Sequence, residues 1–188
     1  MSTETTAFHH VIRLAHPADI PAIRAMQERS IWEIGGAFYK SNEIANLLAL
    51  CGTMDDAVVG EGHYLVAEDR HGAILGSGGW SRSRPGYADA TAADDAAPGV
   101  AIVRSVFVDP AATRCGIASA IMSRTERDAL EHGVDTLQLT ATLSGVALYE
   151  ALGYRTEAAM ELTFADQSRF KCVRMQKSLA KTQNRSAA

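Results

Sequence analysis

The stretch VDPAATRCGIASAIM, residues 108–122, joins a run of apolar residues to the first turns of a helix. The run VAIVRSVFV at 100–108 is nearly continuous in apolar and β-branched residues, which predicts a buried strand. Beyond the turn, apolar residues recur at helical spacing from Gly116 to His132. The expected inner face of that helix consists of Ala118, Ile121, Met122, Thr125 and Ala129. The chain therefore places its smallest residues and Arg114 where a strand becomes a helix.

The residue types in this turn suit an anion. The first N–H groups of a helix lack intrahelical partners and carry a partial positive charge, so a helix N-terminus binds phosphate. Gly116 allows close approach to the backbone, Ala118 keeps the first turn free of bulk, and Arg114 adds a cation at the rim. The sequence therefore predicts a phosphate cradle here. An ordinary tight strand-to-helix turn is the alternative that these residues leave open.

The remaining pattern predicts an α+β fold around a mixed sheet. A turn signal at 70–72 separates two strand-like runs, which indicates an antiparallel hairpin. Ser41 is the expected N-cap of a helix whose buried stripe consists of Ile44, Leu47 and Leu48. Strands are expected at 9–15, 63–69, 73–81, 100–108, 134–142, 155–164 and 170–176, and helices at 17–34, from 41, at 116–132 and at 144–152.

Composition excludes several classes of protein. An apolar content of 47% with 21% charged residues is ordinary for a soluble globular protein. The net charge of -4 argues against a nucleic-acid binder, and no apolar run approaches the ~18 residues of a membrane span. The three cysteines lie far apart, so neither a disulfide framework nor a metal site is expected. The chain has no Walker motif, and GSGG at 76–79 precedes no helix. Because the N-terminus lacks the pattern of a secretory signal, we expect a cytoplasmic protein.

We expect one domain over residues 1–188, with flexible tails at about 1–8 and 180–188. The segment at about 81–99 is rich in glycine, proline, aspartate and alanine without periodicity, which predicts a long loop or flap. Its acidic residues would attract a cationic amine, although an acidic loop is also simply solvated. These residues are Asp89, Asp94 and Asp95.

A second feature is TLSGVALYEALGY at 142–154, one strand beyond the cradle. The apolar face predicted for its short helix consists of Ala147, Leu148, Ala151 and Leu152. Tyr149 then lies on a different flank. A phenol with an ordinary pKa of ~10 suits the protonation of a departing thiolate of similar basicity. A tyrosine with a purely packing role is the alternative.

Together, these features resemble the GNAT superfamily of acetyl-CoA-dependent N-acetyltransferases. The stretch YLVAEDRHGAILGSGGW at 64–80 also resembles the hairpin of a bacterial GNAT subgroup of unassigned substrate. The family signature Gln/Arg-x-x-Gly-x-Gly/Ala is similar to Thr113-x-x-Gly116-x-Ala118, and ALYEALGY resembles the C-terminal LYxxxGF segment. Two residues depart from the pattern. Thr113 stands where glutamine or arginine is usual, and Thr142 stands where asparagine is frequent. The resemblance covers about residues 9–178.

The resemblance implies a mixed, mostly antiparallel central sheet flanked by helices, in which the fourth and fifth strands splay apart and the pantetheine arm of acetyl-CoA fills the gap like an added strand. It implies direct transfer of the acetyl group to a primary amine, with Tyr149 as the general acid for the CoA thiolate. It also implies a homodimer. By residue, it assigns acetyl-CoA binding to Val106, Phe107, Val108, Thr113, Arg114, Cys115, Gly116, Ile117, Ala118, Ser119, Thr142 and Tyr149.

The resemblance places the acceptor pocket between the first two helices and the third strand. The aromatic and acidic residues expected there are Trp32, Glu33, Phe38, Tyr39 and Trp80. Some relatives use a glutamate on the fourth strand as general base, but residues 101–108 contain no carboxylate. The candidates are Glu33, Glu61, His63 and an ordered water, and none is assigned.

The sequence leaves two other functions open. A GNAT-like domain that binds acetyl-CoA without turnover fits the two departures and the missing base. An unrelated nucleotide-binding α+β domain fits only if the cradle is considered alone. For the enzyme, the expected partners are a small-molecule or peptide amine and acetyl-CoA, with no nucleic acid, no membrane and no metal.

Overall fold

A computed structural model describes residues 10–83, 85 and 97–179 of the chain. The strands are β1 (His10–Leu14), β2 (Tyr64–Asp69), β3 (Ile74–Ser81), β4 (Val100–Val108), β5 (Thr136–Thr142), β6 (Arg155–Thr163) and β7 (Arg169–Ser178). The helices are α1 (Ile20–Glu33), α2 (Ser41–Cys51), α3 (Ala57–Gly60), α5 (Ile117–Glu131) and α6 (Val146–Ala151), with short 3₁₀ turns η1 (Pro17–Asp19), η2 (Gly35–Ala37) and η3 (Pro110–Ala112). The predicted loop at 81–99 and both predicted tails fall largely outside the described residues.

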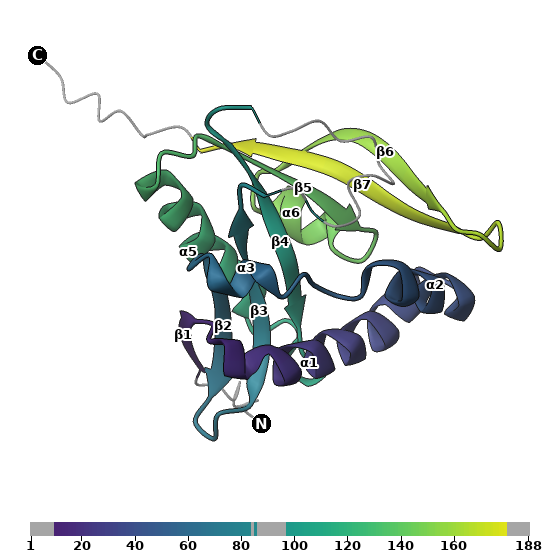
Figure 1. Ribbon diagram of the computed structural model, residues 1–188, viewed down its shortest axis with the longest axis horizontal. Helices are drawn as coiled ribbons and strands as arrows, with labels where there is room; N and C mark the ends of the chain where they lie inside the picture. The colour runs from purple at the N-terminus through teal and green to yellow at the C-terminus, as the bar shows by residue number, and fades with distance from the viewer. Residues whose placement is uncertain (1–9, 84, 86–96, 180–188) are drawn as a thin grey trace, which may run out of the picture.

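The seven strands form one sheet in the order β1-β2-β3-β4-β5-β7-β6 (Figure 1). All neighbours are antiparallel except β4 and β5, which are parallel. This confirms the predicted mixed, mostly antiparallel sheet. The hairpin predicted around 70–72 is also present as β2–β3. None of the described helices is long and apolar enough to cross a membrane.

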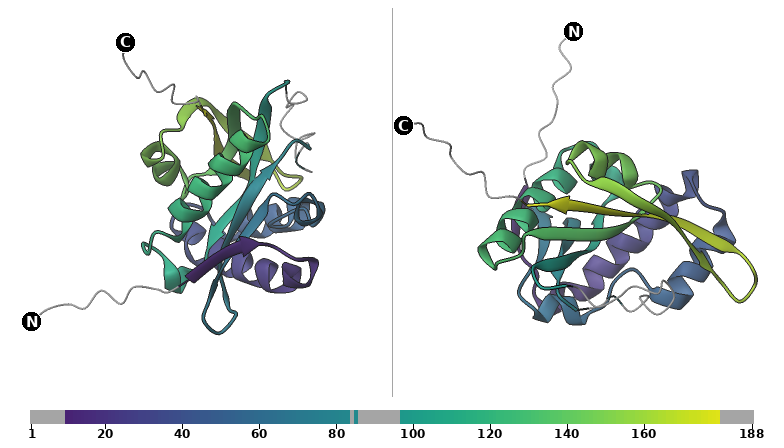
Figure 2. Two further views of the ribbon diagram at one scale, coloured as in Figure 1. Left: turned by 90° about the vertical axis from the view of Figure 1, so that its left-hand side faces the viewer. Right: turned by 90° about the horizontal axis from the view of Figure 1, so that it is seen from above.

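Helices cover both faces of the sheet (Figure 2). Successive strand residues point to opposite faces, and the two cores follow that alternation. Val66 packs in the cluster that contains Ile23 and Met26 of α1, whereas Ala67 packs in the cluster that contains Ile117 and Ile121 of α5. All eight residues of β3 are buried, because this strand lies at the centre of both cores. The sheet is therefore sandwiched between α1 and α5.

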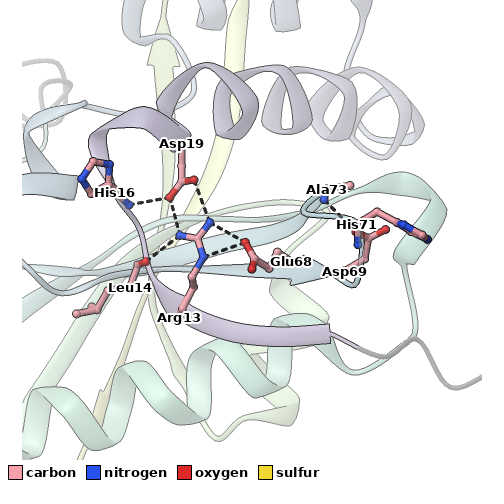
Figure 3. Close-up of polar contacts among 8 residues, drawn as sticks. All are labelled: Arg13, Leu14, His16, Asp19, Glu68, Asp69, His71 and Ala73. Carbon is pink, nitrogen blue, oxygen red and sulfur yellow. Dashed lines mark hydrogen bonds and ion pairs between the residues drawn. The ribbon is translucent and has the colours of Figure 1, made fainter.

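An ion-pair cluster ties the first strand to the start of α1 (Figure 3). The guanidinium of Arg13 lies 2.7 Å from Asp19 and 2.6 Å from Glu68 of β2. Asp19 also accepts the backbone N–H of His16 at 2.7 Å, which caps η1. Hydrogen bonds from Arg13 hold the pKa of Asp19 below its ordinary value. One carboxylate thus orients the turn that leads from β1 into α1.

The start of α2 differs from the prediction. Lys40, rather than Ser41, is the N-cap, and its extended backbone donates its N–H to Glu43 at 2.7 Å. Ser41 is the first helical residue. The negative charge of Glu43 in the first turn suits the positive end of the helix dipole. On the predicted inner face only Ile44 is fully buried, while Leu47 and Leu48 are half-buried.

The predicted apolar face of α6 is wrong except at Leu152, which packs on the core. Ala147 and Ala151 are exposed, whereas Tyr149 is buried with 8% of its surface accessible. Val146 and Leu152 pack on the same core as Tyr149, at spacings of three residues. Because α6 has only six residues, its contacts with the core, rather than its own apolar pattern, determine which side faces inward. Tyr149 therefore belongs to the inner side of this helix.

Candidate functional site

The two parallel strands separate along their length. β4 pairs with β5 only from Val100 to Ile102, opposite Thr136 to Gln138, and then continues alone on that side to Val108. Beyond Gln138, β5 remains paired with β7. The backbone groups of β4 from Val103 onward therefore face a gap in the sheet, which is the arrangement that an extended ligand can complete as an added strand.

A β-bulge at Ser105 accompanies this separation. The β3–β4 register shifts between Ser77 and Gly79, and Ser105 has a φ of 46°, in the left-handed region. Two hydrogen bonds fix it: the phenol of Tyr64 donates to the Ser105 carbonyl at 2.8 Å, and Ser105 Oγ donates to the Thr53 carbonyl at 3.0 Å. A side chain at Gly79 would overlap the His63 carbonyl, so this glycine of the GSGG stretch allows β3 to pack closely against the neighbouring strand.

The predicted cradle forms the entrance to α5. Gly116 is the N-cap, with a φ of 79° and no side-chain capping bond. Because the N–H of Ala120 donates to the Gly116 carbonyl, the amides of the three preceding residues have no partner within the helix. Arg114 and Gly116 are exposed, whereas the Ile117 side chain is buried beneath them. The turn therefore presents free amides and one cation to solvent.

The loop that precedes the cradle is fixed at its start. Asp109 accepts the N–H of Ala111 at 3.0 Å, which caps η3, and its second oxygen pairs with Arg29 of α1 at 2.7 Å. At the other end, Ile117 packs so close to β3 that a Cβ added at Gly76 would lie 2.8 Å from its Cγ2 atom. The cradle is thus held against the sheet by short, direct contacts.

A cavity of about 240 Å³ lies on the α1–α2 side of the gap. Apolar side chains from five elements form most of its wall, and a smaller polar part comes from β4, β5 and the segment after α2. The residues that line it include Cys51, Thr53, Asp55, Arg104, Ser105, Phe107, Thr140, Thr142, Leu162, Phe170 and Cys172. Burial raises the pKa of the Cys172 thiol to about 11, so this thiol is protonated at neutral pH.

Arg104 is the one buried cation among the residues that line this cavity. It is 4% exposed, and it lies 3.7 Å from the carboxylate of Asp55. Its Nη1 donates to the Ser83 carbonyl at 3.1 Å. Arg104 is not among the site residues predicted from the sequence, although its charge within an otherwise apolar strand was the available signal. The charged pair gives the cavity one polar end.

The sequence matches the family model described as "Acetyltransferase (GNAT) domain" over residues 60–156, more than half of the chain. The chain belongs to the GNAT acetyltransferase family. A comparison with curated protein sequences gave no match. The matched range contains the bulged strand, the gap, the cradle and α6.

Solved structures share the GNAT fold with this chain at low identity. A GCN5-related N-acetyltransferase from Rhodopseudomonas palustris is 15% identical, with a TM-score of 0.67 over 94% of this chain and 99% of the other. A phosphinothricin acetyltransferase from Sinorhizobium meliloti, in complex with acetyl-CoA, is 23% identical, with a TM-score of 0.60 over 91% of this chain and 89% of the other. A ribosomal-protein-alanine N-acetyltransferase from Brucella melitensis is 20% identical, with a TM-score of 0.61 over 89% of this chain and 99% of the other.

Within this GNAT domain, the residues predicted for acetyl-CoA fall into two groups. Val106, Phe107 and Val108 lie on the unpaired length of β4, and the segment 113–119 forms the cradle. Thr142 lines the cavity, and its hydroxyl lies 2.9 Å from Ser144 Oγ. Tyr149 packs in the core cluster that also contacts Val106.

The predicted acceptor residues are more scattered. Tyr39 lies behind the cavity wall, where its ring stacks on the lining residue Phe170 at 4.0 Å. Its hydroxyl donates to the Lys171 carbonyl and accepts the Leu143 N–H, and burial raises the pKa of Tyr39 to about 12. None of the predicted acceptor residues is among the described residues that line the cavity. Trp32, Glu33 and Phe38 are exposed outside it.

Trp80 lies apart from this cavity, contrary to its predicted place. It is 2% exposed, and its Nε1 donates to Asp128 of α5 at 2.7 Å. Its alternation on β3 turns it toward α5 rather than toward α1. His63, a candidate base, also contacts Asp128 at 2.8 Å and does not line the cavity, and neither does Glu61.

Proposed function

We propose that this protein is an acetyl-CoA-dependent N-acetyltransferase that moves the acetyl group directly to a primary amine. The observation that supports this proposal is the separation of β4 from β5, which opens toward a helix N-terminus with free amides. An extended chain that ends in a phosphate group fits both features at once. Acetyl-CoA has such a chain, and the Sinorhizobium meliloti structural relative contains it.

In this proposal the pyrophosphate binds the amides between Arg114 and Ser119, and the pantetheine arm bonds to the backbone of Val106 and Val108. Arg114 is exposed at the rim and supplies a positive charge. Thr113 contributes little to the binding of phosphate by its side chain, because its hydroxyl donates to the Pro110 carbonyl. The backbone geometry can therefore tolerate the departure from the usual residue at this position.

The chemistry then requires positioning and one proton donor. The amine nitrogen forms a bond to the thioester carbonyl carbon, the carbon–sulfur bond breaks, and the sulfur takes up a proton. We assign that proton to Tyr149, the phenol that the family motif places on α6. The proton lost by the amine passes to water, since β4 carries no carboxylate. Holding both reactants in line supplies much of the rate.

The cavity favours an acceptor with an apolar body. Phe107, Leu162 and Phe170 contribute to its wall, so burial of an apolar group there is favourable at about 25 cal/mol per Å². Asp55 is half-exposed at the polar end and attracts an ammonium group. A small-molecule or peptide amine with an adjoining apolar group fits these walls.

The experiment is a screen of primary amines with detection of free CoA thiol and of the acetylated product by mass. An enzyme gives steady release of thiol that depends on both the amine and the protein, above the rate of hydrolysis alone. A non-catalytic acetyl-CoA-binding domain gives stabilisation by acetyl-CoA in thermal unfolding but no amine-dependent thiol. The latter result on a broad panel would reject the proposed activity.

A further inference from the structure

Three side chains with metal-binding atoms meet at the end of α5 farthest from the cradle. Asp128 lies on the last turn of α5, His132 follows it, and His63 immediately precedes β2. His63 Nδ1 is 2.8 Å from Asp128 Oδ2, and His132 Nδ1 is 3.5 Å from Asp128 Oδ1. One ligand atom from each residue lies within 4.8 Å of the other two. We propose that these residues bind a divalent transition metal ion such as Zn²⁺.

The donor set selects the class of ion. Two imidazoles and one carboxylate suit zinc, nickel, copper or cobalt, whereas calcium and magnesium prefer oxygen ligands alone. Ligand atoms about 2.1 Å from one ion are separated by roughly 3.0–3.4 Å at octahedral or tetrahedral angles. The two contacts to Asp128, at 2.8 Å to Oδ2 and 3.5 Å to Oδ1, lie close to this range. Because the three ligand atoms lie within 4.8 Å of one another, side-chain movements must bring them closer together when the ion binds.

The surroundings hold two of the ligands in place. Trp80, a buried residue, donates its Nε1–H to Asp128 Oδ2 at 2.7 Å and stacks on the His63 ring at 4.0 Å. A hydrogen bond of this kind orients a ligating carboxylate and strengthens metal binding. Trp80 and His63 both contact Oδ2, so Oδ1, which lies 3.5 Å from His132 Nδ1, keeps lone pairs for the ion. The site is thus built on the core rather than on a loop.

His132 is the adjustable ligand. Its side chain is 49% exposed, compared with 20% for His63 and 32% for Asp128, so an ion and its water ligands can reach the cluster from solvent. Its Nδ1 also lies 2.8 Å from the Asp128 carbonyl oxygen, and metal binding replaces this hydrogen bond. A bound ion would connect the start of β2 to the end of α5. Because none of the three lines the cavity, the proposal is independent of the acetyl-transfer chemistry.

Trp80 provides a direct readout of occupancy. The chain has two tryptophans, so Trp32→Phe leaves Trp80 as the single indole emitter. Titration of this tag-free variant with NiCl₂ should quench Trp80 emission saturably, and excess ZnCl₂ should restore the emission. His9→Gln/His10→Gln in the same background removes the adjacent histidine pair near the N-terminus. Saturable quenching that persists in this background supports the cluster as the site.

His132→Gln should weaken nickel and zinc binding at least tenfold while the exposed position preserves the fold. His71→Gln is the matched control, since His71 is exposed in the β2–β3 turn; it should bind as the parent does. At a Zn²⁺ concentration of 100 Kd, the melting temperature of the parent should rise by about 5–10 °C, and that of His132→Gln should rise by much less. Equal affinities for His132→Gln and His71→Gln, or no saturable quenching up to about 1 mM metal, would identify a hydrogen-bonded cluster without a metal and overturn the proposal.

Discussion

Tyr64→Phe tests how the bulge in β4 is maintained. Tyr64 is 1% exposed, and its hydroxyl donates to the Ser105 carbonyl at 2.8 Å and accepts from Gln27 Nε2 at 3.0 Å. Burial raises the pKa of Tyr64, so the donor proton is retained at all working pH values. Phenylalanine preserves the ring but leaves the carbonyl without its side-chain donor. Gln27 keeps a second partner in Ser77 at 3.0 Å.

The magnitude follows from these contacts. A buried acceptor left without its partner costs about 1–3 kcal/mol. For a chain of this length, each kcal/mol corresponds to a shift of about 2–4 °C, so the melting temperature should fall by about 4–8 °C for a loss of ~2 kcal/mol. Ser105 also has a φ in the left-handed region, which costs a non-glycine residue about 1–3 kcal/mol of strain. The hydrogen bond from Tyr64 helps to offset this strain. Relaxation of the bulge would move Val106 and weaken acetyl-CoA binding.

The assay is calorimetric titration with acetyl-CoA beside thermal unfolding, with Ser77→Ala as the matched control. Ser77 belongs to the same buried network but not to the bulged strand. Both variants should lose stability, while only Tyr64→Phe should lose affinity, by about tenfold for ~1.4 kcal/mol. Parental affinity in a folded Tyr64→Phe protein would refute the link between this hydrogen bond and the gap.

Four further variants test the cradle and the ion-pair cluster. Gly116→Val should weaken acetyl-CoA binding at least tenfold, ~1.4 kcal/mol, in the same calorimetric titration. Gly116→Ala has the same unfavourable φ but adds less bulk, so it should lose less affinity. If both variants bind acetyl-CoA as tightly as the parent, Gly116 is not part of the phosphate site. Cys115→Ala should keep most of the activity, since the proposal uses its amide; acetylated protein by intact mass, absent in the variant, would contradict this. Asp19→Asn should lower the free energy of unfolding. The loss should be full above pH 3.8, the ordinary pKa of the carboxyl group, and should decline as the pH falls through the depressed pKa of the folded state. Urea unfolding of both proteins at several pH values measures this loss, and a loss that grows in acid would contradict the assigned sign.

The strand, turn and helix around Gly116 could be predicted because each signal there is local. A continuous apolar run, a glycine at the N-cap and helical periodicity over four turns agree with one another. The β2–β3 hairpin was predictable for the same reason, since its turn residues lie between two clear strand patterns. These elements carry the cradle and one side of the gap.

Three features depended on tertiary contacts. The orientation of α6 was mispredicted because six residues give too few apolar positions to define a face, and the core selected Tyr149. The prediction placed Trp80 on the wrong side of the sheet. Because β3 is buried on both faces, the alternation of its side chains does not show which face meets α1. The bulge at Ser105, next to the buried Arg104, arises from a register shift that no short pattern encodes.

The most direct test of the proposed mechanism is the single-turnover rate of acetyl transfer in Tyr149→Phe, with an acceptor found in the amine screen. Phenylalanine keeps the buried ring and its edge contact with Tyr154 at 5.6 Å, so fold and acetyl-CoA affinity should change little. Loss of one general acid typically lowers the rate about 10²–10⁴-fold. An acetyl donor with a much more acidic thiol should be far less sensitive to the substitution.

The proposed mechanism predicts that large drop with acetyl-CoA and a small one with the activated donor. A Tyr149→Phe protein that transfers acetyl from acetyl-CoA at the parental single-turnover rate would contradict it, and Tyr149 would then be a packing residue of α6.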